Sequence, residues 1–403
     1  MQSWQHEEGT VAAEPRPLVV LGATGTVGEL TLDVAQRFPA DLRVVALCAH
    51  RNHKRLAQLA ERFAPAAVAL ADPEAAARFR PTGWSGECLA GPEGVRRLAA
   101  WPRPATVINA IVGAAGLEPS LAALRAGHRL GLANKESLVL GGGLLRAAAA
   151  KHGGLILPID SEHSAIQQCL RGHASHEAQR VILTASGGPL RQVPEEELAA
   201  VTPEFALQHP TWRMGARITI DSATLFNKGL ELIEAHWLFD LPFDRLGVWV
   251  HPESIVHGLV EWCDGSLLAQ LSVPDMRLPI QLALSLPARW PGAVARCDLP
   301  RIGSLTFEEP DTERFPCFHL ARGAGEAGGT MPAVANAADE VLVAAFLRRR
   351  IALPDIARGL EQVLAEHTSR PDPALDDILT ADRWGRQRAE AFCHERDAHG
   401  ASR

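Results

Sequence analysis

Two carboxylates follow directly after an apolar run near the middle of the chain. Residues 155–168 read LILPIDSEHSAIQQ, so Asp160 and Glu162 flank Ser161 where a strand candidate ends. Acidic residues at such a point could cap the next helix. They could equally bind a hard cation or transfer a proton at the carboxyl end of a strand. His163 reads as an ordinary residue near the start of the following helix.

A third carboxylate with suitable neighbours lies in the segment DSATLFNKGLELIEAHW, residues 221–237. A helix that begins at about residue 223 places Asn227, Lys228 and Glu231 on one face, because offsets of three and four are neighbours on a helix. Oxygen ligands from separate segments suit Mg²⁺ or Mn²⁺. The alternative is a solvated helix face with an ion pair, and the segment by itself leaves both open.

Several further residues are suited to hold a phosphate group. The stretch TASGGP places Ser186 before two glycines with free backbone N–H groups, and Ser222 precedes the helix just described. The stretch LQHPTWRMGAR contains His209 and Trp212, and its aromatic tip predicts a lid that excludes water. Alone, His209 would read as an ordinary polar histidine, but beside these serines it reads as a phosphate donor.

The segment LANKESLVLGGG adds Asn134, Lys135 and Glu136 directly after another strand candidate. In an open parallel sheet the carboxyl ends of the strands face the ligand crevice. Lys135 could there hold a phosphate or a substrate hydroxyl, with Glu136 orienting it. An ordinary helix start with an acidic first turn is the alternative.

A glycine-rich turn near the N-terminus indicates a dinucleotide site. The stretch VVLGATGTVGEL supplies Gly22, Gly25 and Gly28 between a strand and a helix, where glycines let the backbone approach a pyrophosphate. The second strand ends in LCAHRNHKR, without the acid that binds the ribose 2′-hydroxyl of NAD. Arg51 and Asn52 stand there instead, and an arginine suits a 2′-phosphate. The pattern favours NADP over NAD, and a solvated basic helix start is the alternative.

The elements that would position these residues alternate along the first part of the chain. Helix-like segments such as 28–37 and 53–63 separate the strand-like runs, which predicts βαβ units and a parallel, doubly wound sheet. The strand-like runs are residues 18–22, 43–49, 67–70, 105–112, 129–133 and 155–159.

The second part of the chain has a different texture. The run RVILTAS and the β-rich residues 247–273 predict a second sheet with some antiparallel strands. Prolines between 287 and 310 mark a linker, and an Ala-, Leu-, Glu- and Arg-rich helical region follows from about residue 318. The charged tail beyond about residue 385 is expected to be loose.

Composition excludes several classes of function. The 403 residues carry a formal charge of −7 without a long basic run, which argues against nucleic acid or a membrane as a partner. Seven scattered cysteines without a CxxC pair predict reduced thiols rather than a zinc site or disulfides. The N-terminus reads as a short disordered lead without a signal-like apolar stretch, and the cytoplasm is the expected compartment.

Taken together, the motifs resemble one enzyme family, the 1-deoxy-D-xylulose 5-phosphate reductoisomerases. The resemblance implies a homodimeric enzyme that uses NADPH and Mg²⁺ or Mn²⁺. Its implied reaction converts the sugar phosphate 1-deoxy-D-xylulose 5-phosphate to 2-C-methyl-D-erythritol 4-phosphate, in the non-mevalonate isoprenoid pathway. From about residue 18 to about residue 347, the similar motifs are GATGTVG, LANKESLV, PIDSEHSAIQQ, TASGGP, HPTWRMGARITIDSATLFNKGLELIEAHWLF, PDMRLPI and GEAGGTMPAVANAADEVLVAAFL.

The resemblance also implies roles for individual residues. The implied catalytic set is Lys135 with the three metal ligands Asp160, Glu162 and Glu231. The implied substrate contacts are Lys135, Ser161, Glu162, Ser186, His209, Ser222, Asn227, Lys228 and Glu231. The implied NADPH contacts are Thr24, Gly25, Thr26, Val27, His50, Arg51, Asn52, Asn134, Glu136 and Gly215.

The expected fold class is α/β, with an N-terminal Rossmann-like parallel sheet, a central α+β catalytic domain and a C-terminal α-helical domain. The expected domains are residues 1–160 for NADPH binding, 161–297 for catalysis and dimerisation, a linker at 298–318, and the helical residues 319–403.

Three positions depart from the residues common in this family. His50 stands in place of a glycine, Leu190 in place of a phenylalanine and Asp339 in place of an asparagine. One alternative is a relative that acts on another sugar phosphate, but the intact lid and phosphate motifs argue against it. A second alternative is an inactive NADP-binding regulator, which would be expected to lack one of the three carboxylates.

Overall fold

The computed structural model describes residues 14–292 and 294–400, and the predicted N-terminal lead lies largely outside them. The chain folds into two compact units, each described by itself below. The first unit contains residues up to 137, 143–167 and 275–296, and the second contains residues 138–142, 168–274 and 297 onward.

The first unit is built on a parallel sheet of seven strands in the order β4-β3-β2-β1-β5-β6-β7. The order reverses between β1 and β5, the place where doubly wound sheets open a ligand crevice. The strands are β1 (Arg16–Leu21), β2 (Leu42–Ala49), β3 (Ala67–Leu70), β4 (Glu87–Ala90), β5 (Thr106–Asn109), β6 (Arg129–Leu132) and β7 (Leu155–Pro158).

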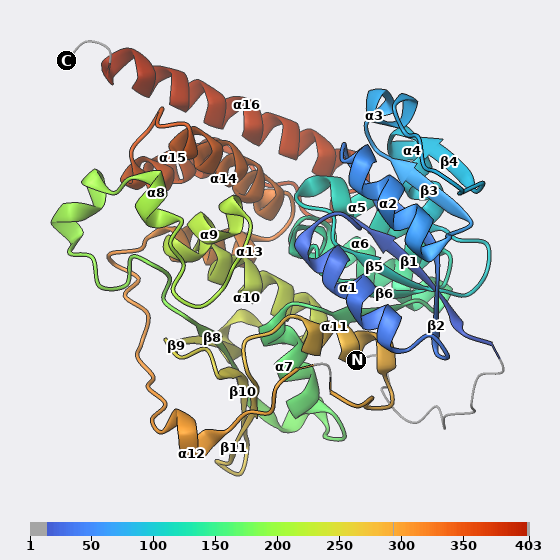
Figure 1. Ribbon diagram of the computed structural model, residues 1–403. Helices are drawn as coiled ribbons and strands as arrows, with labels where there is room; N and C mark the ends of the chain where they lie inside the picture. Colours follow the sequence, from blue (N-terminus) through green and yellow to red (C-terminus); the bar gives the residue numbers. More distant parts are fainter. Residues whose placement is uncertain (1–13, 293, 401–403) are drawn as a thin grey trace. The chain divides into compact units, whose positions relative to one another are not determined.

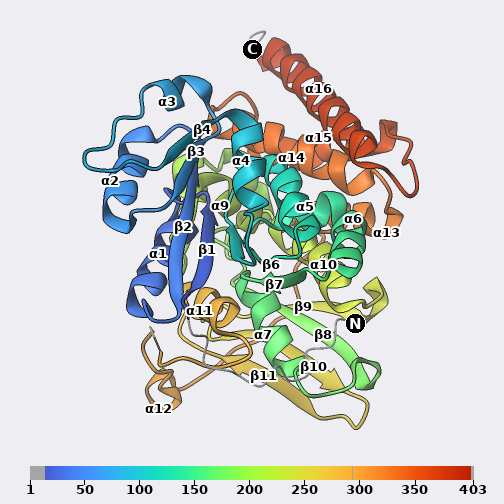
Figure 2. The ribbon, with the colours of Figure 1, turned by 90° about the vertical axis from the view of Figure 1, so that its right-hand side faces the viewer.

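Helices cover both faces of this sheet, as the right-handed crossovers of a doubly wound fold require. Helices α1, α2 and α11 pack on one face, and α4 and α5 pack on the other (Figure 2). The helices are α1 (Thr26–Arg37), α2 (His53–Phe63), α3 (Pro73–Ala77), α4 (Gly91–Ala99), η1 (Ala114–Gly116), α5 (Leu117–Arg125), α6 (Lys135–His152), α7 (Ser161–Leu170) and α11 (Arg277–Ser285).

Most of the predicted strands of this sheet are confirmed to within a residue or two, because each is a run of buried apolar residues. The sequence reading missed β4, a short edge strand whose residues are mostly exposed. It also extended the fifth strand to residue 112, whereas β5 ends at Asn109. Residues beyond Asn109 form a loop whose backbone groups bond to Asn134 and Glu136.

The second unit contains a mixed sheet of four strands in the order β11-β10-β8-β9. Strand β8 pairs parallel with β9 and antiparallel with β10, which confirms the prediction of some antiparallel strands. Ile182, Val256 and Leu259 form the centre of its core. The strands are β8 (Ala178–Ala185), β9 (Leu246–Val250), β10 (Val256–Trp262) and β11 (Leu267–Leu271).

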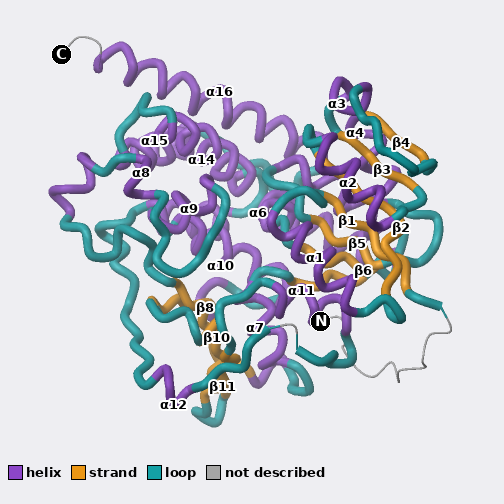
Figure 3. Tube along the Cα trace, viewed as in Figure 1, coloured by secondary structure: helices purple, strands orange, loops and turns teal. Residues whose placement is uncertain are grey.

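Helices and loops make up the remainder of the second unit, and the helices from α13 onward form the helical C-terminal region (Figure 1 and Figure 3). None of the helices in the described residues is long and apolar enough to cross a membrane. They are η2 (Ser175–Glu177), η3 (Glu195–Ala200), α8 (Pro203–Ala206), α9 (Ala216–Ala223), α10 (Phe226–Phe239), η4 (Phe243–Arg245), α12 (Leu299–Ile302), α13 (Cys317–Ala327), α14 (Met331–Leu347), α15 (Leu353–Glu366) and α16 (Leu375–Gly400).

Two expectations for the second unit were wrong. The helix expected from about residue 223 begins at Phe226 instead, because α9 ends at Ala223 and Leu225 adopts a left-handed conformation, with φ of 60°, before α10. The tail expected to be loose beyond residue 385 continues α16 to Gly400, since Ala389, Phe392 and Cys393 are buried and the helix packs on α14. The predicted domain boundaries stay a prediction.

Candidate active site

The glycine-rich turn joins β1 to α1 at the switch point of the parallel sheet. Gly22 has φ of +81°, and a Cβ there would lie 2.4 Å from the carbonyl oxygen of Ala110. A Cβ on Gly28 would lie 2.3 Å from the carbonyl oxygen of Gly22. Gly25 caps α1 without a side-chain hydrogen bond, so the first N–H groups of α1 remain available to an anion. The turn therefore fits the pyrophosphate role that the sequence predicted.

Of the predicted residues around this turn, three line a cavity and one packs against the core. Thr24, Gly25 and Thr26 line one end of a cavity of about 540 Å³ between α1 and α2. Val27 instead packs against the core of the unit, and its carbonyl oxygen accepts a hydrogen bond from Thr31. Val27 is only half-buried at this position.

Arg51 lies at the carboxyl end of β2 with its side chain 74% exposed. Its Nε donates to Asp72 Oδ2 at 2.7 Å, and Asp72 also caps α3. The hydrogen bond from the Ala75 backbone, together with Arg51, lowers the pKa of Asp72. Asn52 caps α2, and His50 is exposed. The guanidinium is therefore oriented by Asp72 while much of it still faces solvent.

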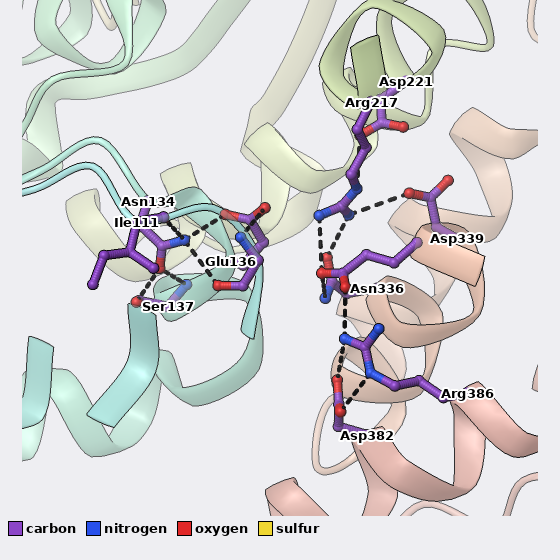
Figure 4. A network of polar contacts seen from close by, with 12 residues as sticks. Ile111, Asn134, Glu136, Ser137, Arg217, Asp221, Asn336, Asp339, Asp382 and Arg386 are labelled. Atoms are coloured by element: carbon purple, nitrogen blue, oxygen red, sulfur yellow. Dashed lines mark hydrogen bonds and ion pairs between the residues drawn. The ribbon is translucent and has the colours of Figure 1, made fainter. Parts of the chain in front are cut away.

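The Asn134–Glu136 pair holds the loop that follows β5. Asn134 caps α6 through Ser137, and its Nδ2 donates to the carbonyl oxygens of Ile111 and Gly113 and to Glu136 Oε2 (Figure 4). Glu136 Oε1 accepts from the Gly113 N–H at 3.0 Å. Both side chains are buried, so their hydrogen bonds hold the loop after β5 in place.

Lys135 and Asp160 form a buried ion pair at the carboxyl ends of β6 and β7. The Nζ–Oδ2 distance is 3.1 Å, and the side chains are 9% and 13% exposed. Burial alone would raise the pKa of Asp160, but the Lys135 ammonium and the His163 side chain hold this pKa well below its ordinary value. Asp160 is therefore ionised at neutral pH. Ser161 donates its hydroxyl hydrogen to the side chain of the adjacent residue, Glu162.

His163 was set aside at the sequence level, yet it is fully buried with Nδ1 3.9 Å from Asp160 Oδ1. It lies on the first turn of α7, three residues after Asp160. This offset was the available signal, because residues three apart are neighbours on a helix. The structure thus adds His163 to the surroundings of Asp160.

In the second unit, α10 presents Asn227, Lys228 and Glu231 together, as the sequence predicted. Asn227 Nδ2 donates to Glu231 Oε1 at 2.6 Å, and Lys228 Nζ donates to Glu231 Oε2 at 2.5 Å. Lys228 also donates to the carbonyl oxygen of Thr184 on β8, a contact that the sequence did not reveal. Lys228 and Glu231 are almost completely buried, which argues against the solvated face considered as an alternative.

Ser186 and His209 lie in contact across the second unit. His209 Nε2 and Ser186 Oγ are 2.9 Å apart, while His209 Nδ1 faces the backbone N–H groups of Thr211 and Trp212. Because Nδ1 accepts from backbone donors, the imidazole is neutral with its proton on Nε2. Burial likewise lowers the pKa of His209. Ser186 Oγ then accepts from His209 and from Gly188, so its own hydrogen can be donated to a ligand.

The turn that follows Ser186 packs closely on α9. Gly188 has φ of +66°, and a Cβ there would lie 2.8 Å from the carbonyl oxygen of Ser222. This approach brings the Ser186 turn and the Ser222 end of α9 side by side. Gly215 caps the other end of α9. The structure thus brings the Ser186 turn and Ser222 together at the C-terminal end of α9.

The predicted residues therefore form two groups. Asp160 and Glu162 belong to the first unit and Glu231 to the second, so the three-carboxylate metal set stays a prediction. Within the units, the contacts join Lys135 to Asp160, Ser186 to His209, and Asn227 and Lys228 to Glu231. Asp72, His163 and the carbonyl oxygen of Thr184 are the neighbours that sequence reasoning missed.

Comparison with known families decides the relationship. Three family models match the chain: 1-deoxy-D-xylulose 5-phosphate reductoisomerase at residues 18–142, its C-terminal domain at residues 156–239, and DXP reductoisomerase C-terminal domain at residues 271–388. The chain belongs to the 1-deoxy-D-xylulose 5-phosphate reductoisomerase family. This finding confirms the resemblance inferred from the motifs.

Curated members of the family are similar over nearly their whole length. The reductoisomerase of Pelodictyon phaeoclathratiforme is 49% identical, over 94% of this chain and 99% of its own. The reductoisomerase of Anaeromyxobacter dehalogenans is 51% identical, over 96% of this chain and 99% of its own.

Solved structures of reductoisomerases are similar in fold as well. That of the Zymomonas mobilis enzyme in complex with NADPH has a TM-score of 0.89 at 43% identity, covering 94% of this chain and 99% of that one. A reductoisomerase in complex with NADPH, fosmidomycin and magnesium has a TM-score of 0.88 at 40% identity, covering 94% and 98%. These structures confirm the predicted fold class.

Proposed function

We propose that this chain converts 1-deoxy-D-xylulose 5-phosphate to 2-C-methyl-D-erythritol 4-phosphate, using NADPH and a divalent cation. Family membership over nearly the whole chain supports this reaction. The observation that carries the proposal is the presence of two buried pairs of a carboxylate and a cation, Lys135–Asp160 and Lys228–Glu231. Burying these two pairs requires the desolvation of four charges, which costs free energy. A protein without catalytic activity would gain no function from this cost.

NADPH is the proposed reductant, and relatives in the family are solved in complex with it. The turn at Thr24, Gly25 and Thr26 would hold the pyrophosphate, because the N–H groups at the start of α1 are available there. Arg51 would bind the 2′-phosphate, with Asn52 and His50 beside it. The remaining proposed contacts are Val27, Asn134, Glu136 and Gly215.

Asp160, Glu162 and Glu231 are the proposed ligands of Mg²⁺ or Mn²⁺, and one relative is solved with magnesium. All three offer oxygen atoms, which hard divalent cations prefer. Asp160 fits this role because Lys135 keeps it ionised. When bound, the cation would polarise the substrate carbonyl and stabilise negative charge on adjacent oxygens.

The substrate phosphate would be held by donors of the second unit. Ser186 can donate its hydroxyl hydrogen, because His209 and Gly188 already donate to its oxygen. The proposed further contacts are Ser222, Asn227 and Lys228, with Lys135 and Ser161 near the reacting carbons. Binding energy from a phosphate remote from the reacting carbons can be used to orient the sugar for reaction.

The proposed protein has three domains and a linker, and it forms a homodimer. Residues 1–160 would bind NADPH, residues 161–297 would supply catalysis and dimerisation, residues 298–318 would link, and residues 319–403 would form the helical domain. A homodimer is supported by β11, an edge strand that exposes Leu267 and Leu268. The described cysteines are free thiols, which agrees with a cytoplasmic location.

The experiment that tests this proposal follows nicotinamide absorbance with purified protein, 1-deoxy-D-xylulose 5-phosphate, NADPH and Mg²⁺ or Mn²⁺. We expect NADPH oxidation that stops when the cation is chelated and resumes when it is restored. Oxidation that is insensitive to chelation would contradict the metal assignment.

A further inference from the structure

Helix α9 has Gly215 as its N-cap and Ser222 near its C-terminal end. The residues at its two ends do little to fix the orientation of the helix axis. Gly215 caps the helix without a side-chain hydrogen bond. Leu225, in a left-handed conformation, separates α9 from α10. The direction of α9 is therefore not fixed by continuation of the longer helix α10. The irregular segment 207–215 leads into α9, and His209 is its contact with Ser186. Contacts with neighbouring elements must therefore orient α9.

Arg217, on the first turn of α9, makes such contacts. Its guanidinium donates to Asn336 Oδ1 at 2.7 Å, to Asp339 Oδ2 at 3.2 Å and to Glu340 Oε1 at 2.9 Å (Figure 4). These three acceptors share one face of α14. Asp221 of α9 also lies 3.5 Å from Nε of Arg217. One planar guanidinium thus joins α9 to α14 at several points, which an ammonium could not reproduce.

Burial and further hydrogen bonds hold the three acceptor side chains of α14 in place. Asn336 and Asp339 are fully buried. Asn336 donates to Glu340 at 3.1 Å, and Arg386 of α16 binds the other oxygen of Glu340 at 2.6 Å. Burial and the nearby charge of Asp221 raise the pKa of Asp339. The face of α14 therefore presents acceptors to Arg217 that are buried or bonded to other residues.

We propose that Arg217 is a positioning residue, whose bonds to α14 set the orientation of α9 and thereby place Ser222 and the segment 207–215 for binding of the substrate phosphate. This inference rests on the proposed function, because that function assigns phosphate binding to Ser222 and His209. Arg217 itself touches no substrate atom in this account. It acts through the helix that carries the donors.

The test compares Arg217→Gln and Arg217→Lys with Arg386→Gln, which removes a cation from the same network without touching α9. We expect Arg217→Gln to raise KM for 1-deoxy-D-xylulose 5-phosphate about tenfold while kcat changes by less than about threefold, because a bond made equally in ground and transition states is lost. Arg217→Lys should rescue part of this loss. Arg386→Gln should lower thermal stability yet leave KM within about twofold of the unchanged protein.

A second readout needs no turnover. Trypsin cleavage after the exposed Arg213 reports the opening of segment 207–215, and we expect it to be about fivefold faster in both Arg217 variants but not in Arg386→Gln. If Arg217→Gln does not fold, Arg217→Lys carries both measurements. Unchanged KM and cleavage in a folded Arg217 variant would overturn the inference, as would an equal effect of Arg386→Gln. An unchanged protein that oxidises no NADPH would instead contradict the proposed function.

Discussion

At the scale of single residues, the proposed site residues include two ion pairs that are formed without any ligand. Lys135 binds Asp160, and Lys228 binds Glu231, and all four side chains are largely buried. Removing one member of such a pair leaves the other charge buried alone, which costs about 3–5 kcal/mol in typical proteins. A substitution in either pair can therefore lower activity by destabilising the protein. Its effect on activity is best compared with that of a substitution at an equally buried charged residue.

Glu231→Gln tests the proposed metal set, since glutamine keeps the size of the side chain but lacks the charge that a hard cation prefers. We expect turnover to fall to background while NADPH still binds, measured by absorbance and by nicotinamide fluorescence. Glu234→Gln is the matched control, because Glu234 is a fully buried carboxylate on the same helix outside the proposed ligands. Normal turnover in Glu231→Gln would refute its role as a metal ligand.

Arg51→Ala tests the cofactor preference. A charge-assisted bond to a phosphate contributes about 1.5–3 kcal/mol, so KM for NADPH should rise about tenfold or more, while KM for NADH changes little. Arg78→Ala, which removes an exposed arginine at the C-terminal end of α3, is the control. An unchanged preference for NADPH over NADH in Arg51→Ala would mean that other residues recognise the 2′-phosphate.

At the scale of elements, the sequence predicted the parallel sheet well because buried apolar runs alternate with helices. It could not predict the break at Leu225, since nothing in the residue type signals a left-handed conformation. It also missed the mostly exposed β4 and the burial that keeps α16 helical to its end. The local sets Asn227–Lys228–Glu231 and Asp160–Ser161–Glu162 were readable from spacing. Partners such as Asp72 for Arg51 come from another segment, and spacing carries no signal for them.

We expect the free energy of unfolding to depend on pH through His257, which lies where β10 pairs with β11. His257 on β10 bonds to the carbonyl oxygen of Ser272 just after β11, and burial lowers the pKa of His257 from 6.5 to about 4. The unfolded chain therefore binds a proton more readily than the folded one below pH 6.5. Stability is full above this value and is lost as the pH falls from 6.5 towards 4, by about 3 kcal/mol.

The comparison for this prediction is His257→Gln, which does not titrate. Chemical unfolding at pH 7 and pH 4 should show a smaller loss of unfolding free energy in the variant than in the unchanged protein, by about 3 kcal/mol. Equal losses in the two proteins would show that His257 is not the group responsible.

At the scale of the whole molecule, the exposed edge of β11 bears on assembly. Leu267 and Leu268 are 46% and 40% exposed on a strand with one unpaired edge among the described strands, which is a surface that can pair with another chain. We expect a double substitution of both leucines by lysine to halve the mass measured by light scattering. Leu299→Lys, at an equally exposed leucine on α12, should leave the mass unchanged. A dimer that survives the double substitution would place the interface elsewhere.

We expect this chain both to rearrange the carbon skeleton of its substrate and to reduce it. Product analysis by NMR, after reaction with 1-deoxy-D-xylulose 5-phosphate, NADPH and Mg²⁺, tests this claim most directly. We predict one molecule of branched 2-C-methyl-D-erythritol 4-phosphate for each NADPH oxidised. An unbranched product of simple ketone reduction, or the absence of NADPH oxidation, would contradict the account.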